Sequence, residues 1–497
     1  MRSLLVFCFQ MSLIFVYGQR KTFEVYTPSG FSKEGYSFAY FNKSSGNFHV
    51  NLQNKTQIFR VLYDSNFNAL NKYEFVSDNM SFNSSETKMP QIAEVIESTI
   101  GHLEVYTDLK KILILKPDFQ KKKDSIVLTK SIQTTSSDER LVTLIPEENG
   151  LKILSMSPKS NTLYLNTWFL GDTNYSDKKE YLLPATNFEN ADIRKFPKPV
   201  RIQFKNSIGY IQARPVDYNS FFSTPISGNR YYTKEKLYLI FYIKYHIGLC
   251  VLELDLNKSS FKLTNYLIND LKYNSDVHPL NKRSLSYVIY DSMMLIRNVS
   301  AQVLEYHFYN LNSGKKIKEY TTSSNQKLNS LIHSDYKQIG TWASRKQEKD
   351  VDRDKAFQRK IKYGGIFLSS FDKIKDSITI THIAFNYTQG IEGTLLSAAT
   401  FQLGYMANIH FGPIQIVPYI YSYRYKLAYA HSRFSINDMQ LSKSNSIRTT
   451  LDKVLEDLDR KEFSASSSFF VKDKKSLLLG NYNTQTRQFQ ITEYNEE

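Results

Sequence analysis

Six residues in the last fifth of the chain have types and a spacing suited to holding a ligand. They lie in PYIYSYRYKLAYAH, residues 418–431. Successive side chains of a strand point to opposite faces, so the tyrosines would share one face and the basic residues the other. Tyrosine rings offer apolar faces and hydroxyl tips that suit sugar rings or a peptide. The predicted ligand-binding residues are Tyr419, Tyr421, Tyr423, Arg424, Tyr425 and Lys426.

A purely structural role is the alternative for this row of rings. The chain contains 35 Tyr and 33 Phe in 497 residues, so aromatic side chains must fill much of its interior. The tyrosines of 418–431 would then pack between sheets, with their hydroxyls reaching solvent or backbone.

Sequence motifs for catalysis or metal binding are missing. The nine histidines are scattered, and no two have the H-x-H or H-x-x-x-H spacing that brings imidazoles to one metal ion. No GxSxG elbow, P-loop or dinucleotide fingerprint occurs. We predict no catalytic residue, no cofactor and no metal site. These predictions favour a protein that is not an enzyme, but they do not decide whether it is one. Carboxylates from separate sheets could still converge, so a secreted carbohydrate-active enzyme is the alternative function.

The elements that would position these residues are short strands joined in hairpins. Apolar and polar residues alternate on both sides of an Asn- and Ser-containing turn in YSFAYFNKSSGNFHVNL (36–52), VLELDLNKSSFKLTNY (251–266) and LEYHFYNLNSGKKIKEY (304–320). Period two on both arms of a polar turn predicts a β-hairpin. A similar pattern occurs near the C-terminus in LLLGNYNTQTRQFQI.

Many short strands from one end of the chain to the other predict an all-β fold. These hairpins, with their φ-x-φ-x-N-x-x-[SG] turns, resemble the outer strands of propeller blades in secreted bacterial proteins, and this general resemblance points to no named family. It implies a β-propeller-like domain, and the chain length accommodates roughly six to eight blades. Tandem β-sandwiches are the alternative architecture.

Two short helices are expected as insertions in this fold. MPQIAEVIESTIG (89–101) has a proline where a first helical turn tolerates it, then apolar residues at helical spacing and a final glycine. TTLDKVLEDLDRK (449–461) places its leucines on one face behind a capping box. Both segments are predicted to be helical.

The N-terminus has the layout of a cleaved signal peptide. Arg2 precedes an apolar run from Leu4 to Tyr17, and Gly18 closes it. A retained membrane anchor would need roughly 20 apolar residues, more than this run supplies. We predict a signal peptide over 1–18, a single propeller-like domain over 19–497 and no transmembrane segment.

The cysteine content indicates where the protein is located, and the net charge indicates which partners it favours. Without residues 1–18 the only cysteine is Cys250, so no disulfide can form within the chain. An exported chain without disulfides suits a bacterial envelope, either periplasmic, outer-membrane-associated or extracellular. The mature chain keeps 63 Lys and Arg against 48 Asp and Glu, a net charge of +15. Such a charge favours anionic partners, and an evenly solvated basic surface is the alternative.

Together these features predict an exported, non-catalytic binding or scaffold protein of the bacterial cell envelope. The expected partner is an envelope protein or an anionic or neutral polysaccharide. Nucleic acid is not expected because the chain is exported. The sequence leaves the oligomeric state undecided.

Overall fold

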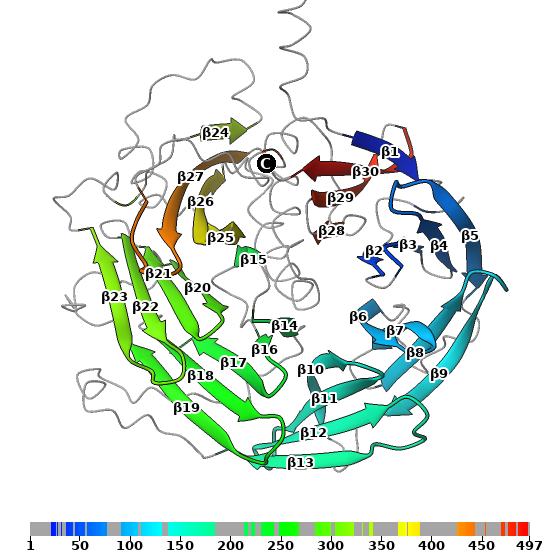
Figure 1. Ribbon diagram of the computed structural model, residues 1–497, viewed down its shortest axis with the longest axis horizontal. Coiled ribbons are helices and arrows are strands. Elements are labelled where there is room, and N and C mark those ends of the chain that lie inside the picture. Colours follow the sequence, from blue (N-terminus) through cyan, green and yellow to red (C-terminus); the bar gives the residue numbers. More distant parts are fainter. Residues whose placement is uncertain are drawn as a thin grey trace, which may run out of the picture.

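The chain folds into a ring of β-sheets. The computed structural model describes residues 21–76, 91–183, 213–322, 331–340, 366–387, 425–442, 453 and 469–495, with short gaps inside these ranges. The strands of these residues form seven sheets, which stand radially around a common centre (Figure 1). This arrangement is a β-propeller, and each sheet is one blade. The prediction of an all-β propeller with six to eight blades is confirmed.

Blades 1 to 3 each use four strands in chain order. Blade 1 consists of β2 (Tyr36–Phe41), β3 (Phe48–Gln53), β4 (Gln57–Tyr63) and β5 (Ala69–Val76). Blade 2 consists of β6 (Gln91–Ser98), β7 (Gly101–Thr107), β8 (Lys111–Asp118) and β9 (Lys123–Ser131). Blade 3 consists of β10 (Arg140–Glu147), β11 (Gly150–Ser157), β12 (Thr162–Phe169) and β13 (Asp177–Leu182).

Blades 4 to 7 include two five-stranded sheets. Blade 4 consists of β14 (Ala213–Pro215), β16 (Arg230–Tyr232), β17 (Lys236–Tyr242), β18 (Gly248–Asp255) and β19 (Phe261–Leu267). Blade 5 consists of β20 (Ser284–Tyr290), β21 (Met293–Val299), β22 (Leu304–Asn310) and β23 (Lys316–Thr321). Blade 6 consists of β15 (Ser220–Ser223), β25 (Ile366–Ile374), β26 (Ser377–Tyr387), β27 (Tyr425–Ser435) and β24 (Lys337–Gly340). Blade 7 consists of β28 (Phe469–Lys472), β29 (Ser476–Asn483), β30 (Gln488–Asn495) and β1 (Lys21–Val25).

Strand β1 closes the ring, because it is the outermost strand of the sheet formed by the C-terminal strands. It pairs antiparallel with β30, with Phe23 opposite Ile491 and Val25 opposite Phe489. Val25 is 1% exposed and belongs to a core shared by blades 7 and 1. The ring of Phe23 stacks on Phe67 of blade 1, with centroids 4.8 Å apart. The first and last strands of the propeller therefore hold each other in place.

The predicted hairpins are confirmed, and two of them have the same turn. In β2–β3, the Asn42 side chain accepts a hydrogen bond from the Ser45 N–H at 2.9 Å. In β22–β23, the Asn310 side chain accepts one from the Ser313 N–H at the same distance. Glycine follows each serine with a positive φ, +71° at Gly46 and +72° at Gly314. Asparagine suits this turn because its side chain replaces a backbone acceptor, and glycine because it alone adopts this φ without strain.

The predicted helix over 89–101 is wrong, because its core forms strand β6. The β6–β7 pairing shifts register between Ile92 and Glu94, which marks a β-bulge. A bulge inserts one extra residue and so breaks the two-residue alternation. The apolar residues on either side of it therefore fall at a spacing that resembles a helix. Gly101, with φ of +111°, begins the next strand after a tight turn.

The second predicted helix, over 449–461, lies outside the described residues except for Lys453. Within the described part of the chain, no helix is long and apolar enough to cross a membrane.

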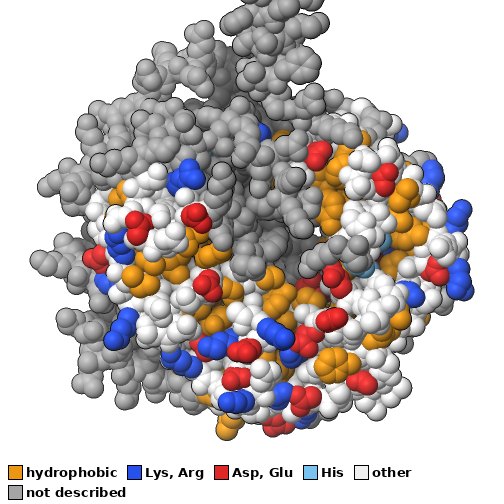
Figure 2. Space-filling view, viewed as in Figure 1, with side chains coloured by type: hydrophobic (Ala, Val, Ile, Leu, Met, Phe, Trp, Pro, Cys, Tyr) orange, Lys and Arg blue, Asp and Glu red, His pale blue; other side chains and the backbone are white. Residues whose placement is uncertain are grey.

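The hydrophobic core lies between adjacent blades. Blades 3 and 4 share a cluster of 16 buried side chains, and blades 4 and 5 share one of 14. The face in Figure 2 shows basic and acidic side chains of the described residues interspersed rather than gathered by sign. The described residues on that face therefore form no patch of a single charge sign.

Candidate functional site

The predicted ligand-binding row lies only partly in the described residues. Tyr419, Tyr421, Tyr423 and Arg424 fall outside them. Tyr425 and Lys426 are the first two residues of β27, where the backbone of Tyr425 lies opposite Tyr387 of β26. The extended conformation predicted for this end of the segment is present, and the ligand-binding role of the six residues stays a prediction.

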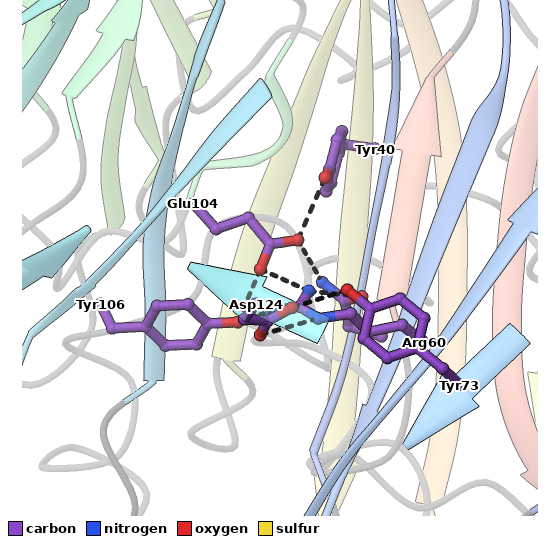
Figure 3. Close-up of polar contacts among 7 residues, drawn as sticks. Tyr40, Arg60, Tyr73, Glu104, Tyr106 and Asp124 are labelled. Carbon is purple, nitrogen blue, oxygen red and sulfur yellow. Dashed lines mark hydrogen bonds and ion pairs between the residues drawn. The ribbon is translucent and has the colours of Figure 1, made fainter. Parts of the chain in front are cut away.

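The densest group of ionisable side chains that the structure describes lies between blades 1 and 2. We call it the blade 1–2 cluster, and Figure 3 shows its members converging from strands of both blades. Blade 1 supplies four of them from four successive strands, Tyr40 (β2), Asn51 (β3), Arg60 (β4) and Tyr73 (β5). Blade 2 supplies the other three, Glu104 and Tyr106 (β7) and Asp124 (β9). In a propeller the first strand of each blade lines the centre, so every member except Tyr40 lies on a strand farther out.

Arg60 stands at the centre of the cluster, and all five of its N–H groups are used. Its Nη1 donates to Glu104 Oε2 at 2.5 Å and to Asn51 Oδ1 at 3.2 Å. Its Nη2 donates to Asp124 Oδ2 at 2.6 Å and to the Tyr106 hydroxyl at 3.4 Å. Its Nε donates to Asp124 Oδ2 at 3.1 Å. A guanidinium has five such donors, so none is left for another ligand.

Glu104 is equally saturated on the acceptor side. Its Oε1 accepts from the Tyr40 hydroxyl at 3.0 Å and from Asn51 Nδ2 at 2.8 Å. Its Oε2 accepts from Arg60 and from the Tyr106 hydroxyl at 2.7 Å. These four bonds use the roughly four acceptor positions of a carboxylate.

Both carboxylates are buried, and their pKa values depend on this burial and on the groups around them. The side chains of Arg60, Glu104 and Asp124 are each 0% exposed. Burial raises the pKa of Glu104, but the charge and hydrogen bonds of Arg60, with those of Asn51 and Tyr106, outweigh it and leave that pKa below its usual value. At Asp124 burial outweighs Arg60 and Tyr73, so its pKa is raised. Glu104 is therefore a firmly ionised ion-pair partner and not a proton donor.

Two histidines stack beside the blade 1–2 cluster. The ring of His49 lies parallel to Tyr40, with centroids 4.6 Å apart, and to His102 of blade 2, 5.9 Å apart. Burial lowers the pKa of His49, Glu104 opposes this effect, and His102 and Arg60 add to it, so that the pKa falls to about 4. His49 is therefore neutral at neutral pH.

A second polar group lies between blades 5 and 6, and we call it the blade 5–6 cluster. It consists of Arg297 (β21), Tyr306 (β22), His382 (β26) and Ser432 (β27), each 0% exposed. Ser432 Oγ lies 3.0 Å from His382 Nε2, the separation expected for a serine nucleophile and its base.

The hydrogen bonds of His382 rule out that catalytic role. Arg297 Nη1 lies 3.1 Å from His382 Nδ1, and a guanidinium only donates, so Nδ1 accepts and Nε2 carries the proton of the neutral ring. Burial, Arg297 and His431 lower the pKa of His382, which keeps it neutral. Ser432 donates its own proton to the Leu331 carbonyl at 2.5 Å. His382 therefore cannot take a proton from Ser432.

The described residues also offer no metal site and no reactive thiol. Among the described residues, no group of three or more His, Cys, Asp or Glu side chains is arranged to hold a metal ion. Cys250 is buried in the core between blades 3 and 4, and burial raises the pKa of its thiol to about 12. A thiol held this far from ionisation is unreactive.

Neither polar cluster was identified from the sequence, although each left a signal there. Arg60 stands in IFRVL, Glu104 in HLEVY and Arg297 in LIRNV. A charged residue inside an otherwise apolar strand is buried with the strand and therefore needs a partner. The partners lie on other blades, 44 residues away for Arg60 and Glu104, and alternation along a strand does not identify them.

Comparison with known proteins adds nothing to the propeller fold. No protein family and no curated protein matches the sequence. The Dos1 propeller is similar over 96% of this chain and 95% of its own, with 8% identity and a TM-score of 0.35. The Nup133 β-propeller domain of Vanderwaltozyma polyspora is similar over 58% of this chain and 74% of its own, with 12% identity and a TM-score of 0.29. Similarities this distant do not bear on function.

Proposed function

We propose that this protein is an exported, non-catalytic binding or scaffold protein of the bacterial cell envelope. The observation that carries the proposal is the saturation of the blade 1–2 cluster. Its guanidinium and its carboxylates are buried and hydrogen-bonded to one another. A catalytic group must reach its substrate, so these residues serve to join blades.

The N-terminal segment and the cysteine content support the proposed location. Residues 1–18 have the layout of a signal peptide, and the remaining chain has one cysteine, buried in the core. A protein that needs no disulfide suits the envelope compartments of a bacterium.

The binding residues we propose are the six of the tyrosine row, Tyr419, Tyr421, Tyr423, Arg424, Tyr425 and Lys426. Tyrosine faces suit sugar rings, and the two basic residues suit anionic groups. The partner is an envelope polysaccharide or an envelope protein.

Affinity electrophoresis combined with a reducing-end assay tests this function. The mature chain is run through gels containing neutral or acidic envelope polysaccharides, and the same mixtures are assayed for released ends. We expect retarded migration without release, and weaker retardation for Tyr421→Ala combined with Arg424→Ala. Glu74→Gln, at an exposed residue of β5, is the matched control. Release of new ends would instead support a carbohydrate-active enzyme.

A further inference from the structure

The interface between blades 1 and 2 is built differently from those between blades 3 and 4 and between blades 4 and 5. Among the described side chains, its apolar cluster contains four buried ones, Ile58, Tyr106, Leu113 and Leu115, with the partly buried Phe38 packed against them. The apolar cluster between blades 3 and 4 contains 16, and that between blades 4 and 5 contains 14. Those pairs of blades are joined by apolar packing, whereas blades 1 and 2 are joined largely by the polar cluster.

Both ion pairs of the blade 1–2 cluster cross this interface. Arg60 belongs to blade 1, and both carboxylates that it binds, on Glu104 and Asp124, belong to blade 2. The histidine stack crosses it too, since His49 is on blade 1 and His102 on blade 2. The contacts between these two blades therefore depend on the protonation of groups at their centre.

Acid protonates both carboxylates and His49. The pKa of Asp124 is raised and that of Glu104 is lowered, so we expect Asp124 to take up a proton before Glu104, and that step relieves an excess of negative charge beside one guanidinium. His49 takes up a proton at about pH 4 and adds a positive charge near Arg60.

The remaining titratable groups around the cluster do not compensate for this change. Burial raises the pKa values of Tyr40, Tyr73 and Tyr106, so these hydroxyls stay protonated throughout. The pKa of Arg60 is raised above its usual value, because the nearby acidic groups outweigh its burial, so it stays charged. Once both carboxylates are neutral, Arg60 is a buried cation without an opposite charge, an arrangement that costs several kcal/mol.

We infer that the interface between blades 1 and 2 is an acid-sensitive joint, at which the propeller opens before it opens at its apolar interfaces. The buried Arg60–Glu104–Asp124 bridge and the stacked histidines form that joint. The inference concerns the stability of the ring and does not depend on the proposed ligand.

Hydrogen exchange of the full mature chain, read blade by blade by mass spectrometry, tests it. Protection factors are measured at neutral pH and at about pH 4, the pKa of His49, after correction for intrinsic exchange at each pH. We expect β2–β5 and β6–β9 to lose about tenfold or more of their protection, because opening this interface exposes His49, which then binds a proton at this pH. Such an opening is local in the sense of a partial unfolding unit. Strands β17–β19 and β20–β22 should keep theirs.

Two outcomes would overturn the inference in the native chain. One is the simultaneous loss of protection in all blades, which would indicate global unfolding. The other is unchanged protection of blades 1 and 2 in acid.

The variant Glu104→Gln imitates the protonated carboxyl at neutral pH. We expect β2–β5 and β6–β9 of this variant to lose protection at neutral pH, as they do in acid in the native chain. Glu74→Gln, the same change at an exposed residue of blade 1, should leave protection unchanged. Equal protection in the two variants would contradict the role of Glu104. If Glu104→Gln fails to fold, the pH series of the native chain still decides the question.

Discussion

A single charged residue in the middle of an apolar strand marks an interface between blades in this protein. Arg60 and Arg297 are both 0% exposed, and both contact a neighbouring blade. Their strands enter the core because of the apolar residues around them, and the charge then has to be satisfied from the next blade. The sequence is sufficient to infer that Arg60 needs a partner, but not that the partner is Glu104.

Removal of the Arg60 guanidinium should strongly destabilise the protein. Arg60→Met leaves Glu104 and Asp124 buried without a counter-charge, which costs about 3–5 kcal/mol. Lys72→Met is the matched control, because it also replaces a basic residue by methionine. Lys72 is exposed on β5, where it pairs with Val61 of β4, so this change should affect stability little. Urea unfolding of both variants measures the difference. Similar losses in the two variants would show that the bridge contributes nothing specific.

The pH dependence of stability should carry a contribution from His49. Its pKa is about 4 in the folded chain and about 6.5 when unfolded, so the unfolded state binds the proton first as the pH falls. The free energy of unfolding should therefore decrease between these two pH values, by up to about 3 kcal/mol. His49→Leu should show a flatter curve over that range and an unchanged slope above it. Identical curves for the two proteins would contradict the lowered pKa.

At the scale of elements, hairpins were predictable and their places in the blades were not. The turn beginning at Asn42 joins the first two strands of blade 1, and the matching turn at Asn310 joins the last two of blade 5. A repeated hairpin that changes its position within the blade gives no regular period. The bulge in β6 made a strand look helical, and β15 joins blade 6 although β14 and β16, its neighbours in the chain, belong to blade 4. These features depend on pairing between distant strands, which local patterns do not contain.

The two matching turns offer an internal comparison. Gly46 and Gly314 have nearly the same positive φ, so alanine at either position should cost about 1–2 kcal/mol in backbone strain. A Cβ at Gly314 would also lie 3.1 Å from Thr264 Cγ2, whereas one at Gly46 would meet nothing within 4 Å. Thermal unfolding should therefore rank Gly314→Ala as the less stable variant. The reverse order would show that the Thr264 contact does not constrain the turn.

At the scale of the whole molecule, the ring depends on one short N-terminal strand. Removal of residues 19–27 would leave the edge of β30 without β1, and an unpaired edge is open to pairing with another chain. We expect the shortened protein to self-associate in light-scattering chromatography. Addition of a peptide with the sequence of residues 19–27 should restore the size of the full chain, and a scrambled peptide should not. A shortened protein that behaves as the full chain does would show that β1 is dispensable.

The predicted function concerns the whole molecule, and the propeller alone does not select it, since one fold serves many functions. The sequence supplied the predicted export signal and the predicted tyrosine row, and the structure supplied the reason to assign the buried charges to stability. Strand patterns could not predict which side chains from distant parts of the sequence come together in the fold.

The most direct test of the proposed role is to recover the protein from its native host with a C-terminal affinity tag. The cells are crosslinked mildly and fractionated first. Mass spectrometry then identifies the molecules that are crosslinked to the protein. We expect the protein in the envelope fraction, without residues 1–18, and with a stoichiometric envelope protein or polysaccharide attached to it. A chain that retains residues 1–18 in the cytoplasmic fraction, or one recovered alone that degrades the polysaccharide, would contradict the proposed role.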